Sequence, residues 1–100
     1  MVIVLTTIGA DADALGLART LVEERLAACV NVLPAMTSIY RWKGTVETDR
    51  EQQLVVKTRP ETVPALEARL KALHPYELPE FVVLSAATSA AYAAWLDEST

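Results

Sequence analysis

Hydrophobic residues follow two kinds of pattern in the first part of the chain. Residues 2–8 form an unbroken apolar and β-branched run, which is typical of a central strand buried on both faces. Gly9 ends that run, and Asp11 or Asp13 can cap the helix predicted after it. The stripe expected on the buried side of this helix comprises Leu15, Ala18, Val22 and Leu26.

The stretch from Val30 to Thr58 predicts an unusually long β-hairpin. Two extended segments, 30–42 and 45–58, flank Lys43 and Gly44, and glycine supplies the positive φ that a two-residue turn needs. A strand of ~12 residues is ~40 Å long, whereas a globule of this size has a radius of gyration of only ~13 Å. Part of the hairpin should therefore project beyond its own domain.

The turn also predicts which residues of the two arms face each other. The expected pairs are Trp42 with Thr45, Tyr40 with Glu47, and Ser38 with Asp49. Large apolar side chains such as Ile39 and Trp42 on a projecting ribbon would be a solubility hazard, which implies a partner subunit that covers them. The alternative is a first arm that ends at Pro34, with residues 35–42 as a loop, because proline cannot donate to a strand ladder.

A second helix is predicted after the hairpin. Thr58 and Glu61 have the spacing of a capping box, and the helix starts either at Pro60 or near Thr62. His74 ends it, because a residue before proline avoids helical angles. The expected apolar stripe is Val63, Leu66, Leu70 and Leu73.

The last part of the chain completes a recognisable order of elements. Residues 81–86 predict a strand, and Ser89 can cap a short helix over residues 90–96 that presents Tyr92 and Trp95 on one side. The order strand, helix, strand, strand, helix, strand, with a small extra helix, is the split βαβ plan. We therefore predict an α+β, ferredoxin-like fold in one domain over residues 1–100. The first and third strands should be central and the second should lie at an edge.

Composition and charge exclude several classes of protein. Fifty-two per cent of the residues are hydrophobic, which is ample for a core, but no apolar run approaches the ~18 residues of a membrane span. The net charge is −4 and the basic residues are scattered, so we expect no nucleic-acid partner. Residues 1–5 lack the features of a signal peptide, and a single cysteine, Cys29, fits a reducing compartment, so we expect a cytoplasmic protein.

The sequence offers few residues for catalysis or for strong metal binding. The three glycines form no phosphate loop, and His74 is the only histidine that could act as a base or ligand. One histidine and one cysteine, Cys29, cannot make a strong metal site within one chain, although a site shared across a symmetric interface could. Glu51, Glu77 and Glu80 could add oxygen ligands, but such carboxylates are usually solvated.

Lys57 has two interpretations. It closes an apolar run and precedes the start of a predicted helix, so it is either paired with a carboxylate or helps to hold an anion at that helix start. We do not expect an enzyme, because nucleophile, base and cofactor motif are missing as a set.

Four segments in this order and spacing resemble the CutA family of divalent-cation-tolerance proteins. They are Leu21–Asn31, Ser38–Gly44, Glu51 with Leu54–Thr58, and His74–Glu80. The resemblance implies a ferredoxin-like subunit that forms a homotrimer through long hairpins, similar to the PII signalling trimers. It also implies a role in tolerance to copper and other divalent ions, with no established enzymatic activity and no required cofactor.

The resemblance also implies where the functional residues lie. The positions shared with the family are expected around the cleft between subunits; they are Cys29, Tyr40, Trp42, Glu51, Lys57, His74, Tyr76 and Glu80. Some members associated with copper have a cysteine near the end of the first strand and a second histidine before the Pro-Tyr pair. Here Thr6 and Leu73 occupy those positions, which weakens the case for copper.

These arguments lead to two functional hypotheses. The first is a non-enzymatic, homotrimeric protein that binds divalent metal ions, copper among them, weakly through His74, Cys29 and Glu51. The alternative is a PII-like small-molecule sensor or scaffold, in which Lys57 and the helix start at Thr58 bind a small anionic ligand in the intersubunit cleft.

Overall fold

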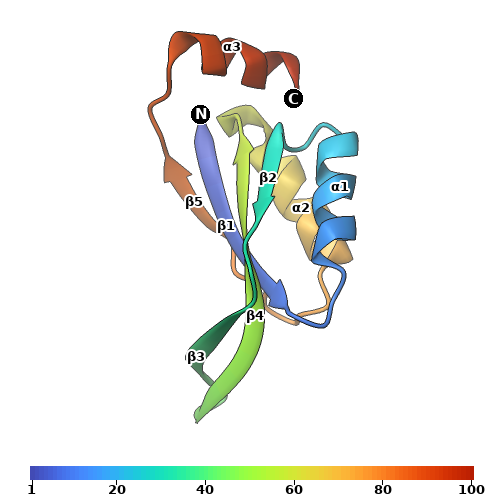
Figure 1. Ribbon diagram of the computed structural model, residues 1–100, viewed down its shortest axis with the longest axis vertical. Coiled ribbons are helices and arrows are strands. Elements are labelled where there is room, and N and C mark those ends of the chain that lie inside the picture. The colour runs from blue at the N-terminus through green and yellow to red at the C-terminus, as the bar shows by residue number, and fades with distance from the viewer.

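A five-stranded antiparallel sheet with two helices on one face forms the body of the protein in a computed structural model that describes residues 1–100 (Figure 1). The strands are β1 (Val2–Gly9), β2 (Cys29–Val32), β3 (Met36–Trp42), β4 (Thr45–Thr58) and β5 (Val82–Ser85). The helices are α1 (Ala14–Glu23), α2 (Val63–Leu73) and α3 (Ala90–Glu98), with a 3-10 turn, η1 (Pro60–Thr62), before α2. The strand order β2-β4-β1-β5 confirms the ferredoxin-like prediction, with β1 and β4 central and β2 at an edge.

The first arm of the hairpin is two strands rather than the single strand predicted over residues 30–42. Both β2 and β3 pair with β4, and the break between them contains Pro34, which has no N–H to donate to the ladder. The alternative of a loop over residues 35–42 is also wrong, because residues 36–42 form β3. Lys43 (φ 50°) and Gly44 (φ 83°) make the turn, and the predicted register is confirmed, including Trp42 opposite Thr45.

The hairpin projects beyond the body of the domain, as its length predicted. β1 pairs with β4 only as far as Glu51, and residues 45–50 pair with β3 alone. The molecule measures 44 × 24 × 24 Å, and the β3-β4 arm accounts for the elongated end in Figure 1. None of the helices is long and apolar enough to cross a membrane.

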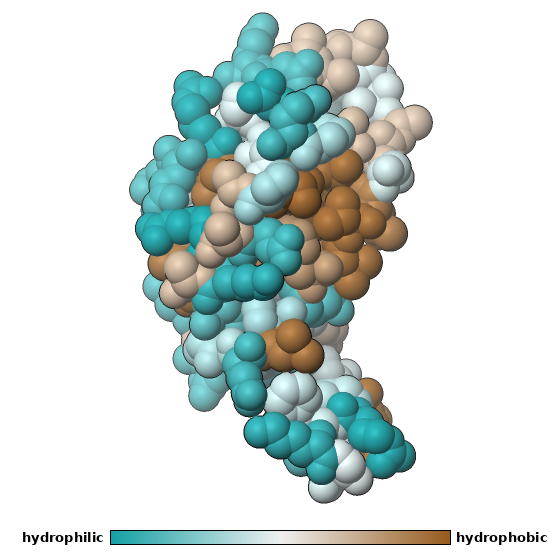
Figure 2. Space-filling model, turned by 180° about the vertical axis from the view of Figure 1, so that it is seen from behind, coloured by the Kyte–Doolittle hydropathy of each residue, from teal (hydrophilic) through white to brown (hydrophobic).

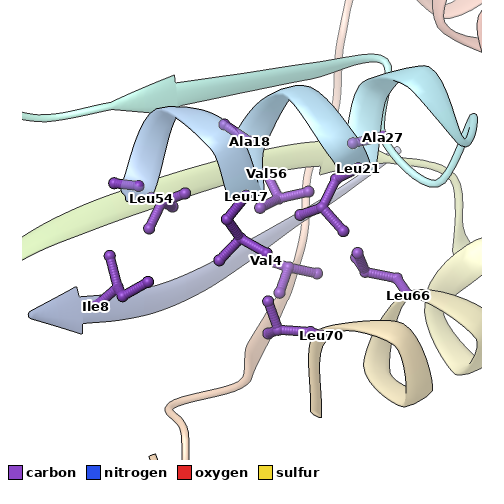
Figure 3. Packing of buried hydrophobic residues seen from close by; sticks show 11 residues of the cluster. Val4, Ile8, Leu17, Ala18, Leu21, Ala27, Leu54, Val56, Leu66 and Leu70 are labelled. Atoms are coloured by element: carbon purple, nitrogen blue, oxygen red, sulfur yellow. The ribbon is translucent and has the colours of Figure 1, made fainter. Parts of the chain in front are cut away.

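The hydrophobic core lies between the sheet and helices α1 and α2 (Figure 3). The buried row of α1 is rotated from the predicted stripe, since its buried residues are Ala14, Leu17, Ala18 and Leu21. Asp13 caps the helix, and Arg25 with φ 60° lies just after its end, so Leu26 is outside it. Leu15, by contrast, is 71% exposed. The helix has two neighbouring apolar rows, one that begins at Ala14 and one that begins at Leu15, and only the first faces the sheet.

The second helix follows the prediction except at Leu73 and in its cap. Leu66 and Leu70 are its buried residues, while Leu73 is exposed. The predicted capping box is wrong, because Thr58 is the last residue of β4 and is fully buried in the core. Of the two predicted starts, Pro60 and Thr62, the second is confirmed, and the helix ends at His74 as predicted. Ser89 caps α3 by accepting a hydrogen bond from the Tyr92 backbone N–H at 3.2 Å.

The other face of the sheet has no helix over it. Along β1, the side chains facing the helices are buried, whereas Ile3 and Leu5 on the opposite face are only half-buried. Their neighbours on β5, Leu84 and Val82, are 46% and 42% exposed. The expectation of a first strand buried on both faces is therefore wrong for a single chain. Figure 2, which views the molecule from behind, shows hydrophobic surface gathered at mid-height towards the right. This corresponds to the left side of Figure 1, where β5 lies. We call Ile3, Leu5, Val82 and Leu84 the uncovered sheet face.

Candidate functional site: a groove beside the hairpin

A groove of about 1010 Å³ lies between the hairpin and the segment that connects α2 to β5. We call this segment, residues 74–80, the connector. The alternation of a β-strand places Ser38, Tyr40 and Trp42 of β3 on one side of the ribbon, together with Asp49 and Glu51 of β4. Both arms therefore direct polar and aromatic side chains into the groove, and the connector closes its other side with Tyr76 and Glu80.

Two tyrosines in the groove are hydrogen-bonded to carboxylates of β4. Tyr40 donates its hydroxyl to Asp49, and that bond, with partial burial and nearby negative charge, raises the pKa of Tyr40 to about 12. Tyr76 donates to Glu51 at 2.7 Å. Burial, followed by this bond to Glu51, raises the pKa of Tyr76 far above its usual value. Both hydroxyls therefore remain protonated well into alkaline solution.

Glu51 is the most deeply buried carboxylate in the chain. Its exposed fraction is 6%, so the expectation of a solvated side chain is wrong for this residue. Glu80 is half-buried and accepts a hydrogen bond from Gln53 at 3.0 Å. Only Glu77 is exposed as expected, in an ion pair with Lys43 of 3.5 Å.

His74 lies beneath the groove, with 7% of its surface exposed. Its Nδ1 accepts from the Tyr76 backbone N–H at 3.1 Å, so the proton must lie on Nε2, which donates to the Thr7 carbonyl oxygen at 2.7 Å. The helix dipole at this C-terminus favours an imidazolium, but these two bonds require the neutral ring. Both ring nitrogens are in use, and neither is free to bind a metal in this arrangement.

The three predicted metal ligands are not brought together within one chain. His74 and Glu51 both contact Tyr76. Cys29 lies opposite Lys57, six positions along β4 from Glu51, which corresponds to ~20 Å. No three side chains among His, Cys, Asp and Glu are grouped so that they could hold a metal ion.

The charge of the groove favours cations. Its carboxylates are Asp11, Asp49, Glu51, Glu77 and Glu80, against one guanidinium from Arg50. Lys57, the candidate anion ligand, lies outside the groove, on the same side of the sheet as Ile3 and Cys29. Sequence reasoning had not chosen Asp49 as a site residue, although the predicted register placed it opposite Ser38 and its two-residue spacing from Glu51 puts both on one face.

The fold and the groove define a class of small ferredoxin-like α+β proteins with a projecting hairpin and an acidic groove beside it. The chain belongs to the CutA1 divalent ion tolerance protein family, which matches residues 2–99. It is 50% identical over 99 residues to the divalent-cation tolerance protein CutA of Thermus thermophilus, covering 98% of this chain and 96% of that one.

Solved structures of relatives agree with this assignment. The divalent cation tolerance protein of Thermus thermophilus superposes with a TM-score of 0.93, covering 100% of this chain and 99% of that one. CutA1 from Pyrococcus horikoshii has a TM-score of 0.93 at 35% identity, covering 100% and 98% of the two chains. The PII-like protein CutA from Nostoc sp. PCC 7120 has a TM-score of 0.91 at 38% identity, covering 100% and 98%.

Proposed function

We propose that three copies of the chain assemble in the cytoplasm into a non-enzymatic trimer that contributes to divalent-cation tolerance. Support for assembly comes from the uncovered sheet face, where Leu84 and Val82 are 46% and 42% exposed although they are apolar. The projecting hairpin adds to it, because a two-stranded ribbon is only marginally stable in water without a partner. A homotrimer of this kind has three equivalent boundaries, each next to a hairpin.

The acidic groove is the observation that carries the proposed cation contact. Five of its lining residues are carboxylic acids, and each ionised carboxylate has about four lone-pair sites, so a bond to a tyrosine or glutamine leaves further acceptor capacity. Oxygen ligands of this type suit hard divalent cations. Because the groove is open, we propose weak and exchangeable binding, in keeping with the tolerance function for which the relatives are named.

Copper is the more demanding part of this proposal. Copper sites favour imidazole or thiolate ligands, for which the chain offers His74 and Cys29. A copper site built with Glu51 and these two residues would need ligands from neighbouring subunits, because Cys29 is remote from the other two in one chain. It would also need His74 to give up one of its two hydrogen bonds.

Calorimetry with charge-matched variants tests the groove. The parent, Asp49→Asn, Glu77→Gln and the control Glu61→Gln would each be titrated with Mn²⁺ and, separately, with Cu²⁺. Glu61 lies in η1, outside the groove, so its variant removes the same charge elsewhere. We expect several-fold weaker Mn²⁺ binding in the two groove variants and parental Mn²⁺ binding in the control, with a smaller change for Cu²⁺ because its proposed ligands are His74, Cys29 and Glu51. Equal Mn²⁺ affinities in all four proteins would refute the groove as the cation site.

A further inference from the structure

Glu51 marks the point where the hairpin leaves the sheet. Along the chain, it is the last residue of β4 that pairs with β3, opposite Met36, and the first that pairs with β1, opposite Gly9. On its hairpin side, a single backbone bond from Ala10 N–H to the Arg50 carbonyl oxygen, of 3.0 Å, joins β4 to the segment after β1. The backbone alone therefore gives the arm little support against bending at this point.

Side chains of the connector supply additional support at that point. The Tyr76 hydroxyl donates to the Glu51 carboxylate at 2.7 Å. Tyr76 is itself fixed through His74, whose ring packs against it with centroids 4.7 Å apart and bonds to the Thr7 carbonyl of β1. A continuous series of contacts thus runs from β1 through the connector to the base of the arm.

A second contact lies two residues further into the sheet. Gln53 donates from one amide nitrogen to the Thr6 carbonyl oxygen at 2.6 Å and to the Glu80 carboxylate at 3.0 Å. The Lys43–Glu77 ion pair at the tip is exposed and contributes little. The two contacts near the base are part-buried, and one of them joins a charged group to a phenol, which makes a comparatively strong hydrogen bond.

We infer that Tyr76 and Glu80 act as positioning residues, clamping β4 at Glu51 and Gln53 so that the connector sets the direction of the hairpin. The effect is large because the arm is a lever. Residues 45–51 span ~20 Å, so a rotation of ~10° at Glu51 moves the tip by ~3.5 Å. This clamp is a property of one chain and does not depend on the proposed trimer.

Electron–electron distance measurements between two nitroxide labels would test the clamp. The labels go on T48C in the arm and K71C on α2, in a C29S background, with each doubly labelled chain diluted into unlabelled protein so that the distance is within one chain. Thr48 and Lys71 are both exposed. We expect a narrow distribution in this parent and about a twofold broader one in Tyr76→Phe, which removes only the hydroxyl.

Three further variants separate the clamp from a general loss of packing. Tyr92→Phe removes the same group from α3 and should leave the distribution unchanged. Glu51→Gln keeps an acceptor for Tyr76 but loses the charge that strengthens the bond, so its distribution should be between those of the parent and Tyr76→Phe. Glu80→Ala should broaden the distribution by removing the second contact. If Tyr76→Phe does not fold, this variant alone tests the clamp. Parental widths in both clamp variants, or equal broadening in Tyr92→Phe, would overturn the inference.

Discussion

Replacing Leu84 by aspartate tests whether the uncovered sheet face is a subunit boundary. Fully burying a leucine contributes about 1.5–3 kcal/mol. Because Leu84 is 46% exposed in one chain, covering the remainder contributes about 1 kcal/mol per copy. Three equivalent copies contribute about 3 kcal/mol, which is a factor of about 100 in the association constant of the trimer.

The midpoint concentration for dissociation follows from that factor. For three identical chains it varies as the inverse square root of the association constant, so the Leu84→Asp variant should dissociate at a concentration about tenfold higher than the parent. An aspartate also has to lose water when the boundary forms, so tenfold is the lower limit.

Sedimentation velocity over a concentration series measures this effect. The molar mass derived from sedimentation of the parent should be three times the 10.9 kDa of one chain. Leu15→Asp is the matched control, because Leu15 is 71% exposed on α1, away from the uncovered sheet face. Circular dichroism checks that both variants fold. A Leu84→Asp protein that sediments like the parent at every concentration, or a Leu15→Asp protein that dissociates equally, would refute the assignment of the boundary.

Two further predictions concern pH and stability. The pKa of Tyr40 is raised to about 12 by its bond to Asp49, and that of Tyr76 is raised further by burial and by Glu51. A phenol whose pKa is raised in the folded protein stabilises the fold at pH values below its unfolded pKa of about 10, and this contribution is lost as the pH rises above that value. The denaturant midpoint should therefore fall as the pH rises past about 10. A flat profile up to about pH 12, or an unchanged profile in Tyr76→Phe, would contradict this. The Thr6 hydroxyl is fully buried without a hydrogen-bond partner, so Thr6→Val should raise the free energy of unfolding in urea by about 1 kcal/mol, and a decrease would show that the hydroxyl is satisfied in solution.

Most of the fold follows from local patterns in the sequence. The turn at Lys43 and Gly44 fixes the hairpin register, because a two-residue loop leaves no freedom to slip. Asp13 and Ser89 identify the starts of two helices, because a side-chain oxygen at those positions can accept from a free backbone N–H. The rotation of α1 could not be predicted, since its two apolar rows have equal spacing and only tertiary packing selects between them.

The site was less predictable because it depends on contacts between distant segments. Glu51 and Tyr76 are 25 residues apart, and nothing in the local sequence of either indicates that a phenol covers the carboxylate. The same holds for His74, where the helix end was predictable but the two hydrogen bonds that fix its tautomer were not. Of the residues that the family resemblance indicates, five line the groove and His74 contacts one of them, whereas Cys29 and Lys57 lie towards the other end of β4.

Glu51 connects the two proposals for this protein, because its carboxylate lines the groove and also accepts from Tyr76 at the base of the hairpin. A cation bound to that carboxylate neutralises part of the negative charge that strengthens its hydrogen bond to Tyr76, so occupancy of the groove should weaken this contact of the clamp. Linkage then requires the reverse effect: whatever fixes the hairpin direction, including a neighbouring subunit packed against it, must change cation affinity by the same factor. Loss of the Tyr76 hydroxyl should thus weaken this coupling between cation affinity and hairpin direction, with the remainder carried by Glu80, whereas loss of Asp49 should weaken cation binding and leave the clamp intact.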